Sequence, residues 1–155
     1  SALEPLVVLP NKVAHNAAPA RELGEAKIDQ AFIGSCANGR IEDFAVAAEI
    51  LDGRQVAPSV RMIVTPGSQS VLKEAIAEGY VETLMNAGAV VTNSTCGACY
   101  GGHMGVLGDG EVCITASTRN FQGRMGSPKA DIYLGSPATV AASAVRGIIT
   151  DPREL

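Results

Sequence analysis

Three of the four cysteines in this 155-residue chain stand in short loops that follow apolar segments. Cys96 and Cys99 form a C-x2-C turn with two small residues between them, which lets two thiolates converge while backbone N–H groups approach the sulfurs. Cys36 follows a Gly-Ser pair at the end of another apolar run. Three such thiolates at one edge of a sheet can hold a cubane iron–sulfur cluster and leave one iron without a protein ligand.

An iron without a protein ligand is a Lewis acid that can bind a hydroxyl and a carboxylate group and polarise a C–O bond. The cysteines therefore predict dehydration of a hydroxy acid. The same spacing occurs in structural zinc sites and in redox dithiols, so a zinc-stabilised or thiol-redox module using Cys36, Cys96 and Cys99, with His103 as a further zinc ligand, is the alternative. A third interpretation is an interaction domain that has kept the fold and lost the chemistry.

Two arginines, Arg119 and Arg124, lie in the polar loop formed by residues 117–124. A planar guanidinium fork binds a carboxylate in bidentate fashion, and two forks suit a di- or tricarboxylic acid better than a neutral substrate. We therefore predict Arg119 and Arg124 as catalytic and substrate-binding residues. The alternative for each is an ordinary solvated side chain.

Other polar residues near the cysteines carry weaker signals. Asn38 and Arg40 follow Cys36 closely and are predicted to contribute to substrate binding. The alternatives are a turn-forming Asn38 and an Arg40 that caps the next helix. His103 is expected to make an ordinary loop hydrogen bond if it does not bind zinc, and Cys113, which stands among β-branched residues, is predicted as a core residue.

The elements that must position these loops are predicted from apolar periodicity and turn residues. Residues 1–27 contain several prolines and are predicted as an extended arm or linker. Residues 28–155 are predicted as one domain, because a chain of 155 residues with 46% hydrophobic content suffices for a single core. Strands are expected at 28–33, 60–64, 89–92, 112–115 and 132–134, and helices at 41–51, between Ser68 and Gly79, at 81–87 and at 137–145.

Strands that alternate with helices indicate right-handed crossovers and a mainly parallel sheet, which is an α/β fold. In such sheets ligands bind at the loops that leave the carboxyl ends of the strands. The cysteine loops and the arginine loop all occupy such positions. We therefore expect them to meet at one edge of the sheet.

Charge and hydropathy exclude several classes of partner. The net charge of -4 and the pI of about 5.1 argue against a nucleic-acid surface, which needs clustered basic residues. No apolar run approaches the ~18 residues of a membrane span, and the first residues lack the features of a signal peptide. The expectation is a cytoplasmic protein with no nucleic-acid or membrane partner and with cysteines used for metal or redox chemistry.

Residues 32–43, 96–105 and 119–124 form three ordered motifs. Together they resemble the aconitase superfamily, in its branch of 3-isopropylmalate dehydratase and homoaconitase large subunits. The resemblance runs from about Leu3 to Gly147 and is to the C-terminal, cluster-bearing domain of these large subunits. Two positions depart from the family pattern: Ala37 stands where the family usually has threonine, and Thr118 where it usually has asparagine.

The resemblance implies a three-layer α/β/α domain with a [4Fe–4S] cluster on Cys36, Cys96 and Cys99, and with Arg119 and Arg124 binding substrate carboxylates. It implies a hydro-lyase that isomerises a hydroxy acid by dehydration and rehydration, with isopropylmalate as the expected substrate. It also implies a small swivelling subunit and preceding large-subunit domains as partners. The chain is therefore expected to be a fragment that lacks activity alone.

Overall fold

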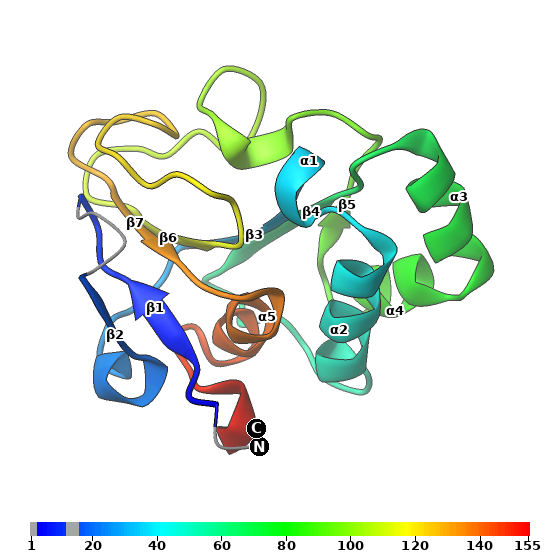
Figure 1. The fold of residues 1–155 in the computed structure, drawn as a ribbon, viewed down its shortest axis with the longest axis horizontal. Helices are drawn as coiled ribbons and strands as arrows, with labels where there is room; N and C mark the ends of the chain where they lie inside the picture. Colours follow the sequence, from blue (N-terminus) through cyan, green and yellow to red (C-terminus); the bar gives the residue numbers. More distant parts are fainter. Residues whose placement is uncertain (1–2, 12–15) are drawn as a thin grey trace.

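The computed structural model describes residues 3–11 and 16–155, which form an α/β fold on one sheet (Figure 1). Within these residues the sheet has seven strands in the order β2-β1-β7-β6-β3-β4-β5. Its parallel part consists of β3 (Gln30–Gly34), β4 (Arg61–Thr65), β5 (Val90–Val91), β6 (Val112–Thr115) and β7 (Asp131–Leu134). The predicted α/β class with a mainly parallel sheet is confirmed, and the predicted elements are present with ends that differ by at most two residues.

The N-terminal segment joins this sheet. Strand β1 (Leu6–Val8) pairs antiparallel with β2 (Ala17–Pro19) and with β7, and a 3-10 turn, η1 (Ala20–Leu23), follows β2. Val7 is fully buried. In the described part of the predicted arm, residues 1–27, two short strands therefore lie within the sheet, because β1 pairs with β7, and a 3-10 turn follows them. Residues 1–2 and 12–15 lie outside the described ranges.

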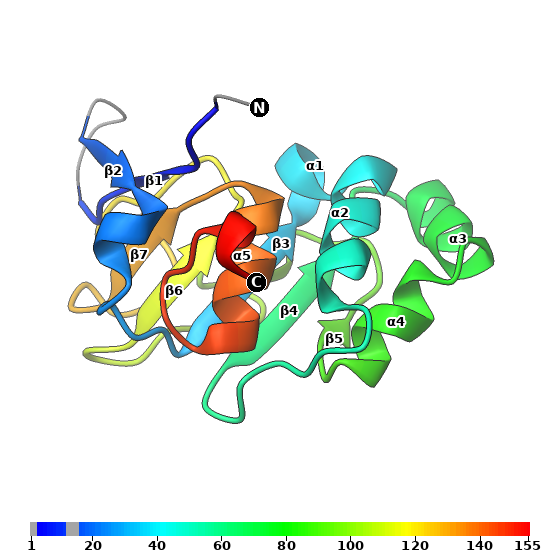
Figure 2. The ribbon, with the colours of Figure 1, turned by 90° about the horizontal axis from the view of Figure 1, so that it is seen from below.

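Four helices cover one face of the sheet (Figure 2). Each of them contributes buried apolar residues to one core cluster, which includes Phe44 and Leu51 at helical spacing. Ser68 and Ser136 act as N-caps by accepting a hydrogen bond from a backbone N–H three residues further on. None of the helices in the described ranges is long and apolar enough to span a bilayer. The helices are α2 (Ile41–Leu51), α3 (Gln69–Ala77), α4 (Tyr80–Asn86) and α5 (Pro137–Arg146).

Loops cover the opposite face. Phe32 of β3 and Ile63 of β4 point to this side and pack against Ala98, Leu107 and Met125, none of which lies in an α-helix. The third layer implied by the family resemblance is therefore built, within the described residues, from irregular segments. The physical reason is the composition of the segment between β5 and β6, whose many glycines disfavour an α-helix.

The order of the parallel strands creates a topological switch point. From β3 the chain adds β4 and β5 on one side and then returns to place β6 and β7 on the other side. The carboxyl ends of β3 and β6 therefore flank the crevice where open α/β sheets bind ligands. A short helix, α1 (Ser35–Asn38), follows β3, and a 3-10 turn, η2 (Gly97–Cys99), follows β5 at the same end of the sheet (Figure 1).

Candidate functional site

Cys36 lies in α1, directly after β3. The chain enters this turn through two residues with positive φ, Gly34 at 141° and Ser35 at 63°. A Cβ on Gly34 would stand 2.2 Å from the carbonyl oxygen of Thr65, so only glycine lets β3 end this close to β4. The turn leaves the side chain of Cys36 exposed.

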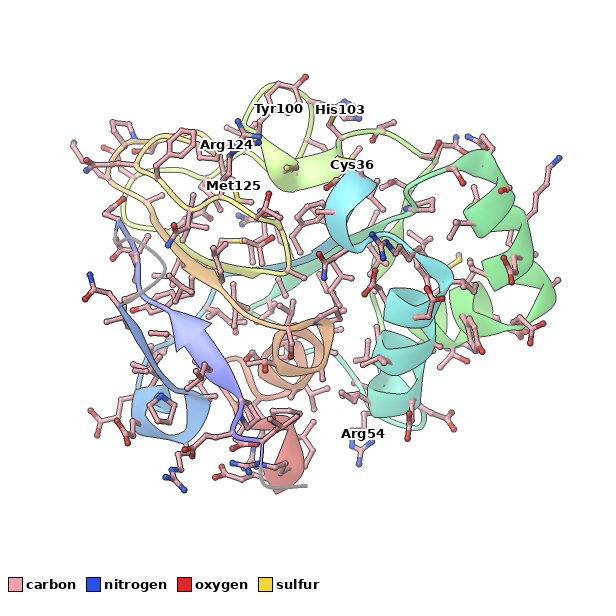
Figure 3. The ribbon with its side chains drawn as sticks, in the orientation of Figure 1. Cys36, Arg54, Tyr100, His103, Arg124 and Met125 are labelled. Atoms are coloured by element: carbon pink, nitrogen blue, oxygen red, sulfur yellow. The ribbon has the colours of Figure 1, made fainter. Side chains whose placement is uncertain are left out.

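Cys96 and Cys99 stand at the two ends of the η2 turn. The N–H of Cys99 donates to the carbonyl oxygen of Cys96 at 3.1 Å and closes the turn. Gly97 has a φ of 55°, and a Cβ there would lie 2.5 Å from the Thr65 hydroxyl oxygen, so the turn rests on the end of β4. The turn also contacts α1, and Figure 3 shows Cys36 beside it. The structure therefore brings the two cysteine loops together, as the sequence predicted.

The cysteines are free thiols, but their arrangement is not that of a site for one metal ion. Among the residues that the structure describes, no three His, Cys, Asp or Glu side chains are placed to hold a single ion. His103 instead forms a hydrogen bond between its Nε2 and the hydroxyl of Thr95, at 3.1 Å.

The two predicted clamp arginines have different surroundings. Arg119 is exposed, and its guanidinium makes no hydrogen bond or ion pair with any described residue. Arg124 is half-buried: its Nε donates to the carbonyl oxygen of Cys99 at 2.9 Å, and its Nη2 lies 3.7 Å from the Cys99 sulfur. The guanidinium carbon also lies 5.6 Å from the centroid of the Phe121 ring. Among the described residues Arg119 has no partner, whereas Arg124 contacts Cys99.

Asn38 and Arg40 occupy the segment that joins α1 to α2. In the amide orientation that satisfies its polar atoms, Asn38 donates from its side-chain nitrogen to the carbonyl oxygen of Ala116 at 3.1 Å. This bond spans the crevice between β3 and β6. Arg40 is the N-cap residue of α2, where its backbone N–H donates to the carboxylate of Asp43 at 3.0 Å and its side chain is exposed. Both residues therefore have a structural contact at the edge where they were predicted to bind substrate.

Two buried serines flank the same crevice and were not predicted from the sequence. Ser35 follows β3 and Ser117 follows β6, and neither hydroxyl has a hydrogen-bond partner among the described residues. An unpaired buried hydroxyl costs roughly 1–3 kcal/mol, so such groups concentrate where function uses them. A serine in a small-residue loop carries no distinguishing sequence signal, and only the strand register places the two on either side of the switch point.

Asn120 is a further residue that sequence reasoning missed. It is 8% exposed, and its side-chain nitrogen donates to the carbonyl oxygens of Leu9 at 2.8 Å and Ile132 at 3.2 Å. These bonds anchor the arginine loop to β7 and to the segment after β1. The position of Asn120 between Arg119 and Arg124 was the one feature of the sequence that could have indicated this role.

A hollow of about 340 Å³ opens between the cysteine loop and the arginine loop. Tyr100, Phe121 and Arg124 line it together with several glycines, so two aromatic rings and one cation face the same space. The hollow begins one residue after Cys99. The edge therefore combines three cysteine thiols, guanidinium groups and a concave surface, and guanidinium groups beside a hollow can bind an anionic small molecule.

Cys113 lies in β6 and is fully buried, which confirms the predicted core role. Burial raises the pKa of its thiol to about 12, and the thiolate is the reactive form of cysteine. We expect iodoacetamide at about pH 8 to modify Cys36, Cys96 and Cys99 of the cluster-free chain and to spare Cys113 until the chain is unfolded. Mass spectrometry of the digested protein checks this; early labelling of Cys113 would contradict it.

The same burial makes stability depend on pH in the alkaline range. The unfolded chain releases the Cys113 proton near the ordinary value of 9.0, whereas the folded chain keeps it up to about 12. Because the unfolded chain then binds fewer protons, the free energy of unfolding should fall as the pH rises from about 9 to 12. A Cys113→Val variant should lose that part of the decrease in urea titrations, and unchanged pH dependence would count against the assignment.

This chain is similar in sequence to proteins of one known family. The family model described as Aconitase family (aconitate hydratase) matches residues 8–147. The 3-isopropylmalate dehydratase large subunit of Mycolicibacterium smegmatis is 62% identical over 155 residues, which cover 100% of this chain and 37% of that protein. The large subunit of the same name from Aliarcobacter butzleri is 54% identical over 154 residues, covering 99% of this chain and 36% of that protein.

A third relative, the 3-isopropylmalate dehydratase large subunit of Aquifex aeolicus, is 52% identical over 160 aligned residues and again spans 100% of this chain and 37% of that protein. The chain thus spans a little over a third of the length of the curated relatives it matches. The matched region includes both cysteine loops and the arginine loop.

Proposed function

Since the chain belongs to the aconitase family, as its motifs predicted, we propose that it is the cluster-bearing domain of a hydro-lyase of the 3-isopropylmalate dehydratase type. The observation that carries this proposal is the meeting of Cys36, Cys96 and Cys99 in two contacting loops at the switch point of the sheet. A ligand-binding crevice is expected at that place on physical grounds alone. The names of the relatives supply the reaction class.

The donor set fits a [4Fe–4S] cluster held by Cys36, Cys96 and Cys99. In a cubane each thiolate would bind a different iron, so three cysteines on two contacting loops suffice to hold it. The unpaired hydroxyls of Ser35 and Ser117 beside the crevice also suit a site that receives a ligand with acceptor atoms. When bound, such a cluster supplies an iron that acts as a Lewis acid toward a substrate hydroxyl and carboxylate.

The residues around the thiolates define the substrate class. The guanidinium of Arg119, which has no partner in the described part of the chain, can bind a carboxylate in bidentate fashion. The exposed side chain of Arg40 adds positive charge at the same edge. Asn38 reaches across the crevice to the carbonyl oxygen of Ala116. These side chains suit a hydroxy di- or tricarboxylic acid. Together with the names of the relatives, they indicate isopropylmalate as the substrate and leucine biosynthesis in the cytoplasm as the pathway.

Further parts of the protein complete the site in this proposal. The relatives are named as large subunits, and the chain spans about 37% of their length. A small subunit and the remaining large-subunit domains would then cover the open edge and add catalytic groups. Because the isolated edge is open to water and oxygen, we expect this chain alone to bind a cluster and to lack hydro-lyase activity.

Cluster reconstitution tests the proposal. The chain is purified without oxygen, supplied with iron and sulfide, and examined by visible absorption and electron paramagnetic resonance beside Cys96→Ala and Cys113→Ala variants. We expect a broad cluster absorption in the wild type and in Cys113→Ala, with a three-iron signal after mild oxidation, and its complete loss in Cys96→Ala. Uptake of zinc alone, or equal absorption in both variants, would refute the assignment of these ligands.

A further inference from the structure

Arg124 is oriented toward a cysteine. We infer, on the basis of the proposed function, that Arg124 is a positioning residue that holds Cys99 in place and donates a hydrogen bond to its sulfur when the cluster is bound. This role differs from the predicted one, in which Arg124 forms half of a substrate clamp. Figure 3 shows Arg124 at the loop edge between Tyr100 and Met125.

Two of the five N–H donors of Arg124 are directed at Cys99. Its Nε donates to the Cys99 carbonyl oxygen at 2.9 Å, and its Nη2 lies 3.7 Å from the Cys99 sulfur. These two nitrogens form one side of the planar guanidinium fork, the side that would otherwise bind a carboxylate through two parallel bonds. Substrate binding through this fork would therefore require Arg124 to release Cys99.

Backbone hydrogen bonds hold the segment that bears Arg124 against the cysteine loop. The N–H of Gly101 donates to the Arg124 carbonyl oxygen at 2.9 Å, and the N–H of Leu107 donates to that of Met125 at 2.8 Å. A Cβ on Gly101 would stand 2.5 Å from the carbonyl carbon of Met125, so the two segments touch through their backbones. The cysteine loop and the segment bearing Arg124 therefore behave as one unit.

Arg119 and Arg124 differ in their exposure and in their contacts. Arg119, five residues earlier, is exposed and without a partner among the described residues, whereas Arg124 is half-buried and packed beside Phe121. Lysine cannot reproduce the contacts that Arg124 makes with Cys99, because an ammonium group is a single centre without a planar fork. A hydrogen bond to a cluster thiolate also raises the reduction potential of the cluster.

The test uses Arg124→Lys and Arg119→Lys in the reconstituted chain. For Arg124→Lys we expect a lower reduction potential in spectroelectrochemical titration and about tenfold faster bleaching of the cluster in air, the usual scale for removal of a group that supports a metal ligand. Arg119→Lys should match the wild type in both. A wild-type potential and wild-type air stability in Arg124→Lys would overturn the inference while leaving the proposed function intact.

Amide hydrogen exchange of the cluster-free chain provides a second measurement. In Arg124→Lys only the segment at residues 99–101 should exchange faster, and β3 should stay protected. Equal loosening of β3 would show a general effect on folding and would overturn the positioning role. If the wild type itself takes up no cluster, the proposed function fails, and the exchange data still decide whether Arg124 holds Cys99.

Discussion

Replacing Gly34 with alanine should lower the free energy of unfolding by about 3 kcal/mol or more and prevent cluster assembly. The new Cβ would stand 2.2 Å from the Thr65 carbonyl oxygen and 2.8 Å from its backbone nitrogen. Both atoms belong to the backbone of β4 and cannot move aside without disturbing the sheet. Relief of the clash would displace the turn that carries Cys36. Urea denaturation and cluster absorption after reconstitution measure the two effects.

Gly53→Ala is the matched control for this prediction. Gly53 also has a positive φ, 69°, but a Cβ there would meet no atom within 4 Å. Alanine should therefore cost only the backbone strain of about 1 kcal/mol, and the cluster should form normally. An equal loss of stability in both variants would mean that strain in φ, and not the contact between β3 and β4, sets the requirement for glycine.

Arg119→Ala should reduce kcat/KM of the assembled enzyme about 100-fold, because truncating one partner of a charge pair that is desolvated on binding costs at least about 2–3 kcal/mol. The guanidinium has no partner among the described residues, so its loss should leave the stability and the cluster absorption unchanged. Steady-state kinetics of the full-length large subunit with its small subunit measure the change, most of which should appear in KM.

Arg54→Ala serves as the control for loss of a surface arginine. Arg54 donates from Nη1 to the carbonyl oxygen of Ile50 at 2.8 Å, and it lies at the end of the molecule opposite Cys36 (Figure 3). We expect this variant to keep wild-type kinetics. If Arg119→Ala also keeps them, Arg119 does not bind the substrate, and the carboxylate contacts must come from elsewhere in the protein.

Much of the fold was predictable because it depends on local patterns. Apolar runs bounded by turn residues identified β3, β4 and β6, and helical spacing in residues 41–51 identified α2. Cys113 was correctly predicted as a core residue, because β-branched neighbours in a strand indicate burial. The cysteine and arginine motifs were also sufficient to identify the family, since three ordered motifs at compatible spacing rarely coincide by chance.

The N-terminal strands and the loop layer could not be predicted in this way. Strand β1 has three residues and is stabilised by pairing with β7, a contact between residues more than 100 positions apart. A local sequence pattern does not indicate which distant strand will pair with β1. The second face of the sheet is covered by segments without helical periodicity, whose burial depends on how Phe32 and Ile63 meet Leu107 and Met125.

The sequence by itself determined which chemical groups are present and which end of the sheet carries them, because strand direction and loop position follow from local periodicity. The tertiary structure decided what each group touches. The sequence spacing did not distinguish Arg119 from Arg124, but the packing of two loops directs Arg124 to Cys99 and leaves Arg119 without a partner among the described residues. The register of β3 and β6 likewise places the unpaired hydroxyls of Ser35 and Ser117 at one crevice. These contacts join residues distant in the chain, so their geometry depends on the whole fold.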